Sequence, residues 1–124
     1  MTTPRVGKPV RGSRTGRPIM VALDLLGRRA ALRVLWELRG PDPLTFRALQ
    51  EAAATNPALL NTRLKELREA GLVEHDAGYR LSAEGRALLR AMQPLSAWAE
   101  AWGGARPAVK RGAKTPGAAS RRAP

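Results

Sequence analysis

One stretch of the sequence, NPALLNTRLKELREAGLVE from Asn56 to Glu74, combines an apolar stripe at helical spacing with a small polar set. At 100° per residue, Leu64 and Leu67 fall within about 40° of Leu60. The other side of this helix carries Ala58, Thr62 and Lys65, with Asn61 at its edge. Amide, hydroxyl and ammonium groups bond base edges or phosphates, and a small alanine allows close approach. This side is therefore a candidate nucleic-acid contact; the alternative is an ordinary solvated surface.

The rest of the sequence offers little for catalysis or metal binding. His75 is the sole histidine and there is no cysteine, which excludes histidine clusters, thiolate sites, disulfides and thiol redox switching. Carboxylates such as Glu66 and Glu69 suit ion pairs along a helix better than a catalytic pair. No glycine-rich loop precedes a phosphate site. We therefore expect a protein that is not an enzyme and that uses neither a metal nor a cofactor.

The charge of the chain is strongly positive and unevenly placed. The 22 basic residues outnumber 10 acidic ones, for a net charge of +12, which favours polyanionic partners such as nucleic acid. The two ends contain basic residues and no acid: Arg5, Lys8, Arg11, Arg14 and Arg17 in residues 1–18, and Arg106, Lys110, Arg111, Lys114, Arg121 and Arg122 in residues 103–124. Both ends are rich in Pro, Gly, Ser and Thr, so we expect disordered basic tails. Residues 19–102 are nearly neutral.

The length of 124 residues allows one compact domain, expected over residues 19–102, between two tails. The run IMVALDLL is too short to span a bilayer and contains Asp24. It also lacks the features of a secretory signal. We expect a cytoplasmic protein that does not enter a membrane.

Helical spacing and breakers predict three helices in the first half of this domain. Pro18 and Gly27 frame a short first helix. A second helix is predicted over residues 28–39, ending before Gly40. Its apolar stripe is expected to lie in the core: Leu32, Leu35, Trp36 and Leu38. Thr45 is the predicted cap of the next helix.

The second half begins with the helix that contains the polar set. Asn56 is its predicted N-cap, Pro57 its first residue, and Gly71 its left-handed stop. Two successive helices joined by a short turn make a helix-turn-helix candidate. The alternating pattern of LVEHDAGYRLS then predicts a hairpin with its turn at residues 76–78.

A last helix is predicted from Ser82 to Trp102, with Pro94 expected to kink or split it near Ala91. One face is apolar throughout, and a small domain has little room to bury it. We therefore expect part of this face to pack against a second copy of the chain. The expected interface residues are Leu88, Met92, Leu95, Trp98 and Trp102. The alternative is that both tryptophans belong to an internal core.

The order helix, helix, turn, helix, hairpin, helix is the plan of a winged helix-turn-helix: mainly α with a small β-hairpin wing. The stretches LLNTRLKELREAGLVE, GYRLSAEGRALL and LSAWAEAW resemble the HxlR-type transcriptional regulators, winged-helix relatives of the MarR group. The resemblance extends roughly from Ile19 to Trp102. Its most specific parts are the block from Leu60 to Val73 and the residues Tyr79, Leu81, Gly85 and Trp98.

This resemblance implies a cytoplasmic prokaryotic homodimer that places the third helix of each subunit in successive major grooves of DNA. The family's recognition helix corresponds to residues 56–70. The residues expected at base edges are Asn61, Thr62, Lys65 and Ala58. Those expected at phosphates are Asn56, Arg63, Arg47, Thr45 and Arg80. For Arg63, a structural ion pair is the alternative.

The sequence also departs from the family pattern. There is no cysteine near the N-terminus, so a thiol-based signal is excluded, and no small-molecule effector is identifiable. Arg29 stands where the family has a tryptophan. Thr45 stands where the family often has an arginine, and Arg47 is a substitute for that phosphate contact.

Three functions agree with these observations. The first is a sequence-specific dimeric transcriptional regulator. The second is an architectural protein that coats DNA through the winged helix and the basic tails, although acids near the exposed face, Glu66 and Glu69, count against it. The third is a winged helix that binds protein or RNA. The basic tails either add sequence-independent binding to phosphates or serve only to keep the protein soluble.

Overall fold

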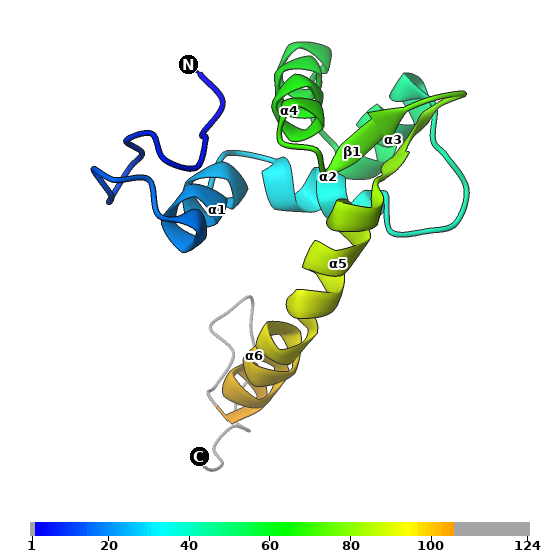
Figure 1. The fold of residues 1–124 in the computed structure, drawn as a ribbon. Coiled ribbons are helices and arrows are strands. Elements are labelled where there is room, and N and C mark those ends of the chain that lie inside the picture. The colour runs from blue at the N-terminus through cyan, green and yellow to red at the C-terminus, as the bar shows by residue number, and fades with distance from the viewer. Residues whose placement is uncertain (1, 106–124) are drawn as a thin grey trace. The chain divides into compact units, whose positions relative to one another are not determined.

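The structure, a computed structural model, describes residues 2–105. They form a mainly helical winged helix-turn-helix with a two-stranded hairpin (Figure 1). The elements are α1 (Pro18–Leu26), α2 (Ala31–Glu37), α3 (Phe46–Ala53), α4 (Pro57–Glu69), β1 (Val73–His75), β2 (Tyr79–Leu81), α5 (Ala83–Ala91) and α6 (Gln93–Ala105). The described residues divide into two compact units, 2–89 and 90–105. No helix among the described residues is long and apolar enough to cross a membrane.

The predicted starts of α3 and α4 are confirmed by side-chain caps. The Thr45 hydroxyl accepts a hydrogen bond from the backbone N–H of Ala48 at 3.0 Å. Asn56 Oδ1 accepts one from Leu59 at 2.8 Å, and Pro57 follows as the first residue of α4. Each cap satisfies an N–H group that the first turn of a helix leaves unpaired, which stabilises the helix by about 1 kcal/mol.

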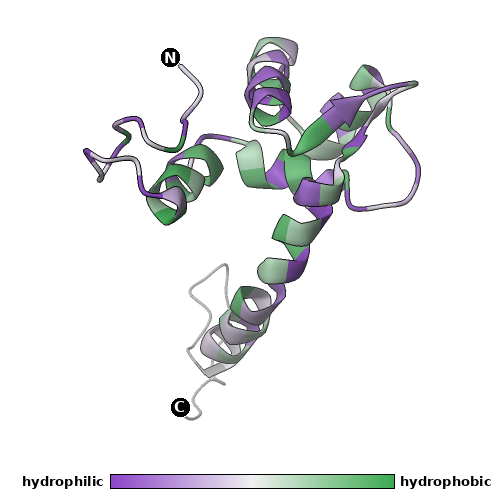
Figure 2. Cartoon of the chain, viewed as in Figure 1, coloured by the Kyte–Doolittle hydropathy of each residue, from purple (hydrophilic) through white to green (hydrophobic). Residues whose placement is uncertain are grey.

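The core of the first unit is formed by the inner faces of the helices together with the hairpin. Its fully buried members are Val34, Leu35, Leu38, Leu49, Leu60, Leu64 and Leu67. Hydrophobic and hydrophilic residues alternate around α4, as they must in a helix with one face in this core (Figure 2).

Of the four residues predicted to form the buried stripe of the second helix, two are buried and two are exposed. Leu35 and Leu38 are buried, but Leu32 is 43% exposed and Trp36 is 53% exposed. The helix starts only at Ala31, after a left-handed Ala30, and its buried stripe is centred about 100° or more away from the two exposed side chains. Trp36 instead contacts the Arg39 guanidinium, whose Cζ lies 4.0 Å from the ring centroid.

The predicted hairpin is confirmed, and it has a further backbone contact. β1 and β2 pair antiparallel, with Val73 opposite Leu81. Leu44, in the loop before α3, exchanges two backbone hydrogen bonds with Tyr79, of 2.7 and 2.9 Å. The wing is therefore fixed to the entrance of the helix-turn-helix.

The expectation of a disordered N-terminal tail is wrong for residues 2–17, which we call the N-terminal arm. Val10 and Ser13 pair through backbone bonds of 2.8 and 3.0 Å, and Gly7 donates to the Gly16 carbonyl at 2.9 Å. Gly16 has φ +69°, and a Cβ there would lie 2.2 Å from the Lys8 carbonyl oxygen. The glycines that indicated disorder thus form tight turns. The expected C-terminal tail lies largely outside the described residues, although residues 103–105 belong to α6.

The prediction that Pro94 kinks or splits the last helix is confirmed, and the structure shows the split. α5 ends at Ala91, and α6 begins at Gln93 with Pro94 in its first turn. A proline there removes no hydrogen bond, because the first N–H groups of a helix have no partner within it.

We predict that Gly85→Ala destabilises the fold although alanine favours helices. A Cβ at Gly85, in the first turn of α5, would lie 2.2 Å from the Leu72 carbonyl oxygen. The overlap should cost roughly 1–3 kcal/mol of unfolding free energy beyond the ~1 kcal/mol gained in helix propensity. Urea unfolding measures it, with Gly103→Ala as control because a Cβ there meets nothing within 4 Å. Equal stability of the two variants would contradict this packing.

Candidate nucleic-acid interface

The outer face of α4 carries the polar set that the sequence indicated. Asn61, Thr62 and Lys65 are exposed, while the apolar side of the helix is buried. The Thr62 hydroxyl donates to the Ala58 carbonyl at 3.1 Å, so its oxygen lone pairs remain available. The side chains of Asn61 and Lys65 make no hydrogen bond or ion pair with the described residues. This face therefore presents donors and acceptors that the fold itself does not use.

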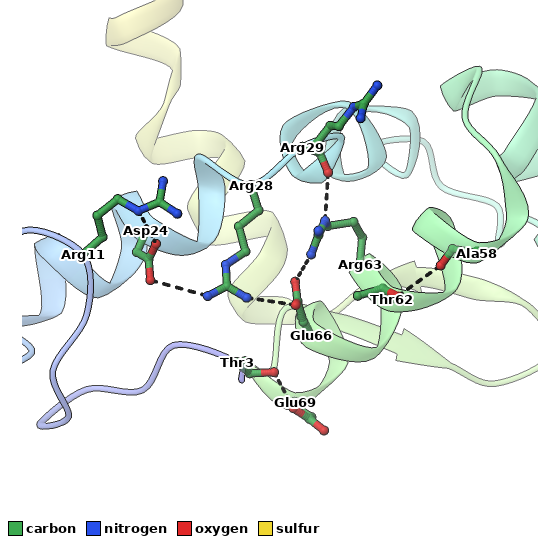
Figure 3. A network of polar contacts seen from close by, with 10 residues as sticks. All are labelled: Thr3, Arg11, Asp24, Arg28, Arg29, Ala58, Thr62, Arg63, Glu66 and Glu69. Atoms are coloured by element: carbon green, nitrogen blue, oxygen red, sulfur yellow. Dashed lines mark hydrogen bonds and ion pairs between the residues drawn. The ribbon is translucent and has the colours of Figure 1, made fainter. Parts of the chain in front are cut away.

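The inner face of α4 contains a charged cluster (Figure 3). One Glu66 carboxylate oxygen accepts from Arg63, and the other accepts from Arg28 at 2.9 Å. Arg63 Nε donates to the Arg29 carbonyl at 2.8 Å. Arg28 also lies 3.6 Å from an Asp24 carboxylate oxygen. The cluster joins α4 to α1 and to the turn between α1 and α2.

This cluster decides between the two interpretations of Arg63. Its side chain is 11% exposed and forms an ion pair with Glu66, so the structural ion pair is what the structure shows. We therefore leave Arg63 out of the set expected at phosphates. The expectation that Glu66 lies near the exposed face is also wrong, because its side chain is only 4% exposed. A helical wheel places Arg63 about 60° and Glu66 about 120° from the centre of the apolar face. Burial of these charges is possible because Glu66 pairs with both Arg63 and Arg28.

The other candidates for phosphate contact lie on the surface, and they differ in the hydrogen bonds and ion pairs that they already make within the protein. Arg47 has a side chain that is 90% exposed and lies 4.0 Å from Glu51, a contact that contributes little in water. Arg80 on the wing pairs with Glu74 at 3.2 Å and Asp76 at 3.6 Å. Thr45 and Asn56 use their oxygen atoms as caps. The hydroxyl hydrogen of Thr45 and the amide group of Asn56 remain able to donate.

In the second unit, α6 presents an apolar face to solvent. Leu95, Trp98 and Trp102 are 57%, 58% and 51% exposed. The two tryptophan rings stack with centroids 5.4 Å apart. Of the other expected interface residues, Leu88 packs against the core of the first unit and Met92 is partly buried.

Within the described part of the chain, no group of three or more His, Cys, Asp or Glu side chains could hold a metal ion.

Comparisons with known proteins identify the family to which this fold belongs. The family model described as a helix-turn-helix domain matches residues 26–76. The crystal structure of quinone-bound YodB from B. subtilis is 30% identical, covering 68% of this chain and 97% of that one, with a TM-score of 0.63. The chain belongs to the HxlR-type winged helix-turn-helix transcriptional regulators. A search of the curated proteins found no match.

Two further solved structures share the fold. A possible HxlR family transcriptional factor from Thermoplasma volcanium is 24% identical, with 65% of this chain and 80% of that chain covered and a TM-score of 0.57. A MarR family protein of Mycobacterium tuberculosis is 30% identical, with 65% and 63% covered and a TM-score of 0.54. YodB, in a second structure of its reduced form, is described as a transcriptional regulator, and the Thermoplasma protein as a possible transcriptional factor. As a member of this winged helix-turn-helix family, the HxlR-type chain is a DNA-binding transcriptional regulator and not an enzyme.

Sequence reasoning missed two parts of this HxlR-type interface. Asp24 and Arg28 are spaced i, i+4, a signal for a helix ion pair, but nothing local indicates that Arg28 also reaches Glu66. The N-terminal arm was missed altogether. The Thr3 hydroxyl donates to Glu69 Oε1 at 2.5 Å, a contact between residues far apart in sequence that no local pattern predicts.

We predict that Glu66→Ala destabilises the regulator strongly. The substitution leaves the buried guanidinium groups of Arg28 and Arg63 without their shared carboxylate, which should cost about 3 kcal/mol or more of unfolding free energy. Glu69→Ala is the matched control on the same helix, because Glu69 is exposed, and should cost less than about 1 kcal/mol. Chemical denaturation of both variants compares them. Similar small losses would show that the cluster does not anchor α4.

Proposed function

We propose that this protein is a sequence-specific transcriptional regulator that binds duplex DNA as a homodimer, with α4 of each subunit in the major groove. The observation that carries the proposal is the exposed polar face of α4, where Asn61, Thr62 and Lys65 offer hydrogen-bonding groups that the fold does not use. The opposite face of the helix is held by the core and by the ion pairs of Glu66. A reading helix must be held rigidly, because hydrogen bonds to bases tolerate little displacement.

The chemistry of this face suits base edges. An asparagine amide pairs with adenine N6 and N7, and a lysine ammonium donates to guanine O6 and N7. Thr62 supplies an acceptor and a methyl group, and Ala58 one turn earlier leaves room for a base pair to approach. In this proposal, Asn56, Thr45 and Arg47 donate to phosphates beside the bases that α4 reads, and these contacts fix the register of the helix on the duplex. On the wing, Arg80 already forms ion pairs with Glu74 and Asp76, which would compete with a phosphate contact.

The homodimer is proposed from the apolar face of α6. Leu95 and Trp98 are large side chains more than half exposed to water, and a second copy of the same face would remove them from it. A dimer of winged helices reads two half-sites separated by about one helical turn of DNA, roughly 34–36 Å.

An architectural DNA-coating role remains the second candidate, favoured by the net charge of +12. One of the two acids that counted against it, Glu66, is buried and paired, which weakens that objection. A coater binds any duplex alike, whereas a regulator prefers one site. Affinity for the gene's own upstream region beside a scrambled duplex separates the two.

A small-molecule effector is compatible with this family, since the YodB structure contains a bound quinone. The present chain has no cysteine. We therefore propose that any effector of this regulator acts without capture by a thiol.

We predict that Asn61→Ala and Lys65→Ala each reduce site preference by ~1–3 kcal/mol, because each removes a hydrogen bond to a base edge. The quantity to measure is the ratio of affinities for the upstream site and a scrambled duplex. Arg47→Ala is the control, and as a phosphate contact it should weaken binding to both duplexes alike. Equal losses on both duplexes for the α4 variants would refute base reading.

We predict that the double variant Leu95→Ala, Trp98→Ala shifts the protein from dimer to monomer, because it removes the large apolar side chains from α6. Sedimentation across a concentration series measures the dissociation constant. Glu100→Ala is the control, since Glu100 lies on a different side of the same helix by its spacing. An unchanged dimer in the double variant would place the interface elsewhere.

A further inference from the structure

The N-terminal arm is attached to the helices of the first unit at two points, one on α4 and one on α1. Near its start, Thr3 donates to Glu69 on α4 at 2.5 Å, and the neighbouring Pro4 is buried. Farther along, Arg11 lies 3.9 Å from Asp24 on α1 (Figure 3). Backbone hydrogen bonds within the arm, between Gly7 and Gly16 and between Val10 and Ser13, hold it in tight turns.

A groove of about 810 Å³ lies between the arm and α4. Arg5 and Lys8 line it from the arm, and Asn61, Thr62 and Lys65 line it from α4. The residues proposed to read bases therefore form one wall of a groove whose other wall is the arm.

The groove has a surplus of unpaired positive charge. Of its acids, Asp24 and Glu66 form ion pairs with Arg28. Glu69 accepts a hydrogen bond from the neutral Thr3 hydroxyl and keeps its negative charge, so one unpaired acid faces the cations of the groove. By contrast, the side chains of three cations in its lining make no ion pair with the described residues: Arg5, Lys8 and Lys65. Cations without partners along an open groove match a ligand with regularly spaced negative charges.

We propose that the arm is a second DNA-contacting element, and that this groove holds the phosphodiester strand bordering the major groove entered by α4. The proposal rests on the proposed DNA-binding function and extends it to Arg5 and Lys8. A helix in the major groove has a sugar-phosphate strand along its side, and the arm supplies cations on that side. Because the arm is folded before binding, little conformational entropy is lost when it meets DNA.

The arm also contains a matched control within its own sequence. Arg14 and Arg17 are exposed on the same segment, but they do not line the groove. Replacing either pair removes two positive charges from the arm, and only the pair Arg5 and Lys8 removes charge from the groove.

The experiment compares Arg5→Ala, Lys8→Ala and Arg14→Ala, Arg17→Ala double variants of the full chain with the wild type, on the upstream duplex and its scrambled form across a salt series. Each phosphate contact contributes about 0.9 to the slope of log affinity against log salt. We expect the groove variant to lower the slope by about 1.8 per subunit, which is about 3.6 for the bound homodimer, on both duplexes. The control variant should leave the slope nearly unchanged.

Equal slopes for the two double variants would overturn the proposal, because charge on the arm would then act without regard to the groove. Tighter binding by the groove variant would also overturn it, since the arm would then be a cover over α4. Failure of the proposed function looks different: the wild type would bind both duplexes alike. If the groove variant still lowered the slope there, the arm contact would stand while site-specific reading would fall.

Discussion

A buried carboxylate, that of Glu66, holds α4 in place together with the leucines of its inner face. Each of its oxygens accepts from a different arginine, one on α4 itself and one on the turn after α1. A carboxylate buried alone would be strongly disfavoured, and so would the two guanidinium groups. Together they form a cross-link whose geometry is fixed by directed hydrogen bonds, which apolar packing of α4 alone would not supply. The direction of the outer face of α4 depends on this cross-link.

The same cluster connects α4 with the N-terminal arm. Arg28 joins Glu66 to Asp24, and Asp24 in turn lies near Arg11. A chain of ion pairs of alternating sign thus connects the arm, α1 and α4. Arg29 stands where the resembled family has a tryptophan, and it contributes its carbonyl oxygen to Arg63. A backbone carbonyl is available from any residue, so the departure from the family pattern at this position leaves the cluster intact.

Features that depend on short-range chemistry were predictable from the sequence. The caps at Thr45 and Asn56, the hairpin turn and the split at Pro94 each follow from residues within a few positions. The polar face of α4 followed from helical spacing. Burial of Arg63 and Glu66 could not be predicted, because it depends on Arg28, which is far away in sequence. The arm was misjudged because composition alone does not distinguish glycines in tight turns from glycines in flexible chains.

The most direct test of base reading by α4 is the selection of binding sites by the full chain from a pool of random duplexes. If α4 of each subunit of a dimer reads bases, the selected sequences should converge on a motif with two-fold symmetry, its half-sites about 10 base pairs apart or a multiple of that spacing. If the chain binds DNA tightly but the pool stays random after repeated rounds, the outer face of α4 does not read sequence and the account is wrong.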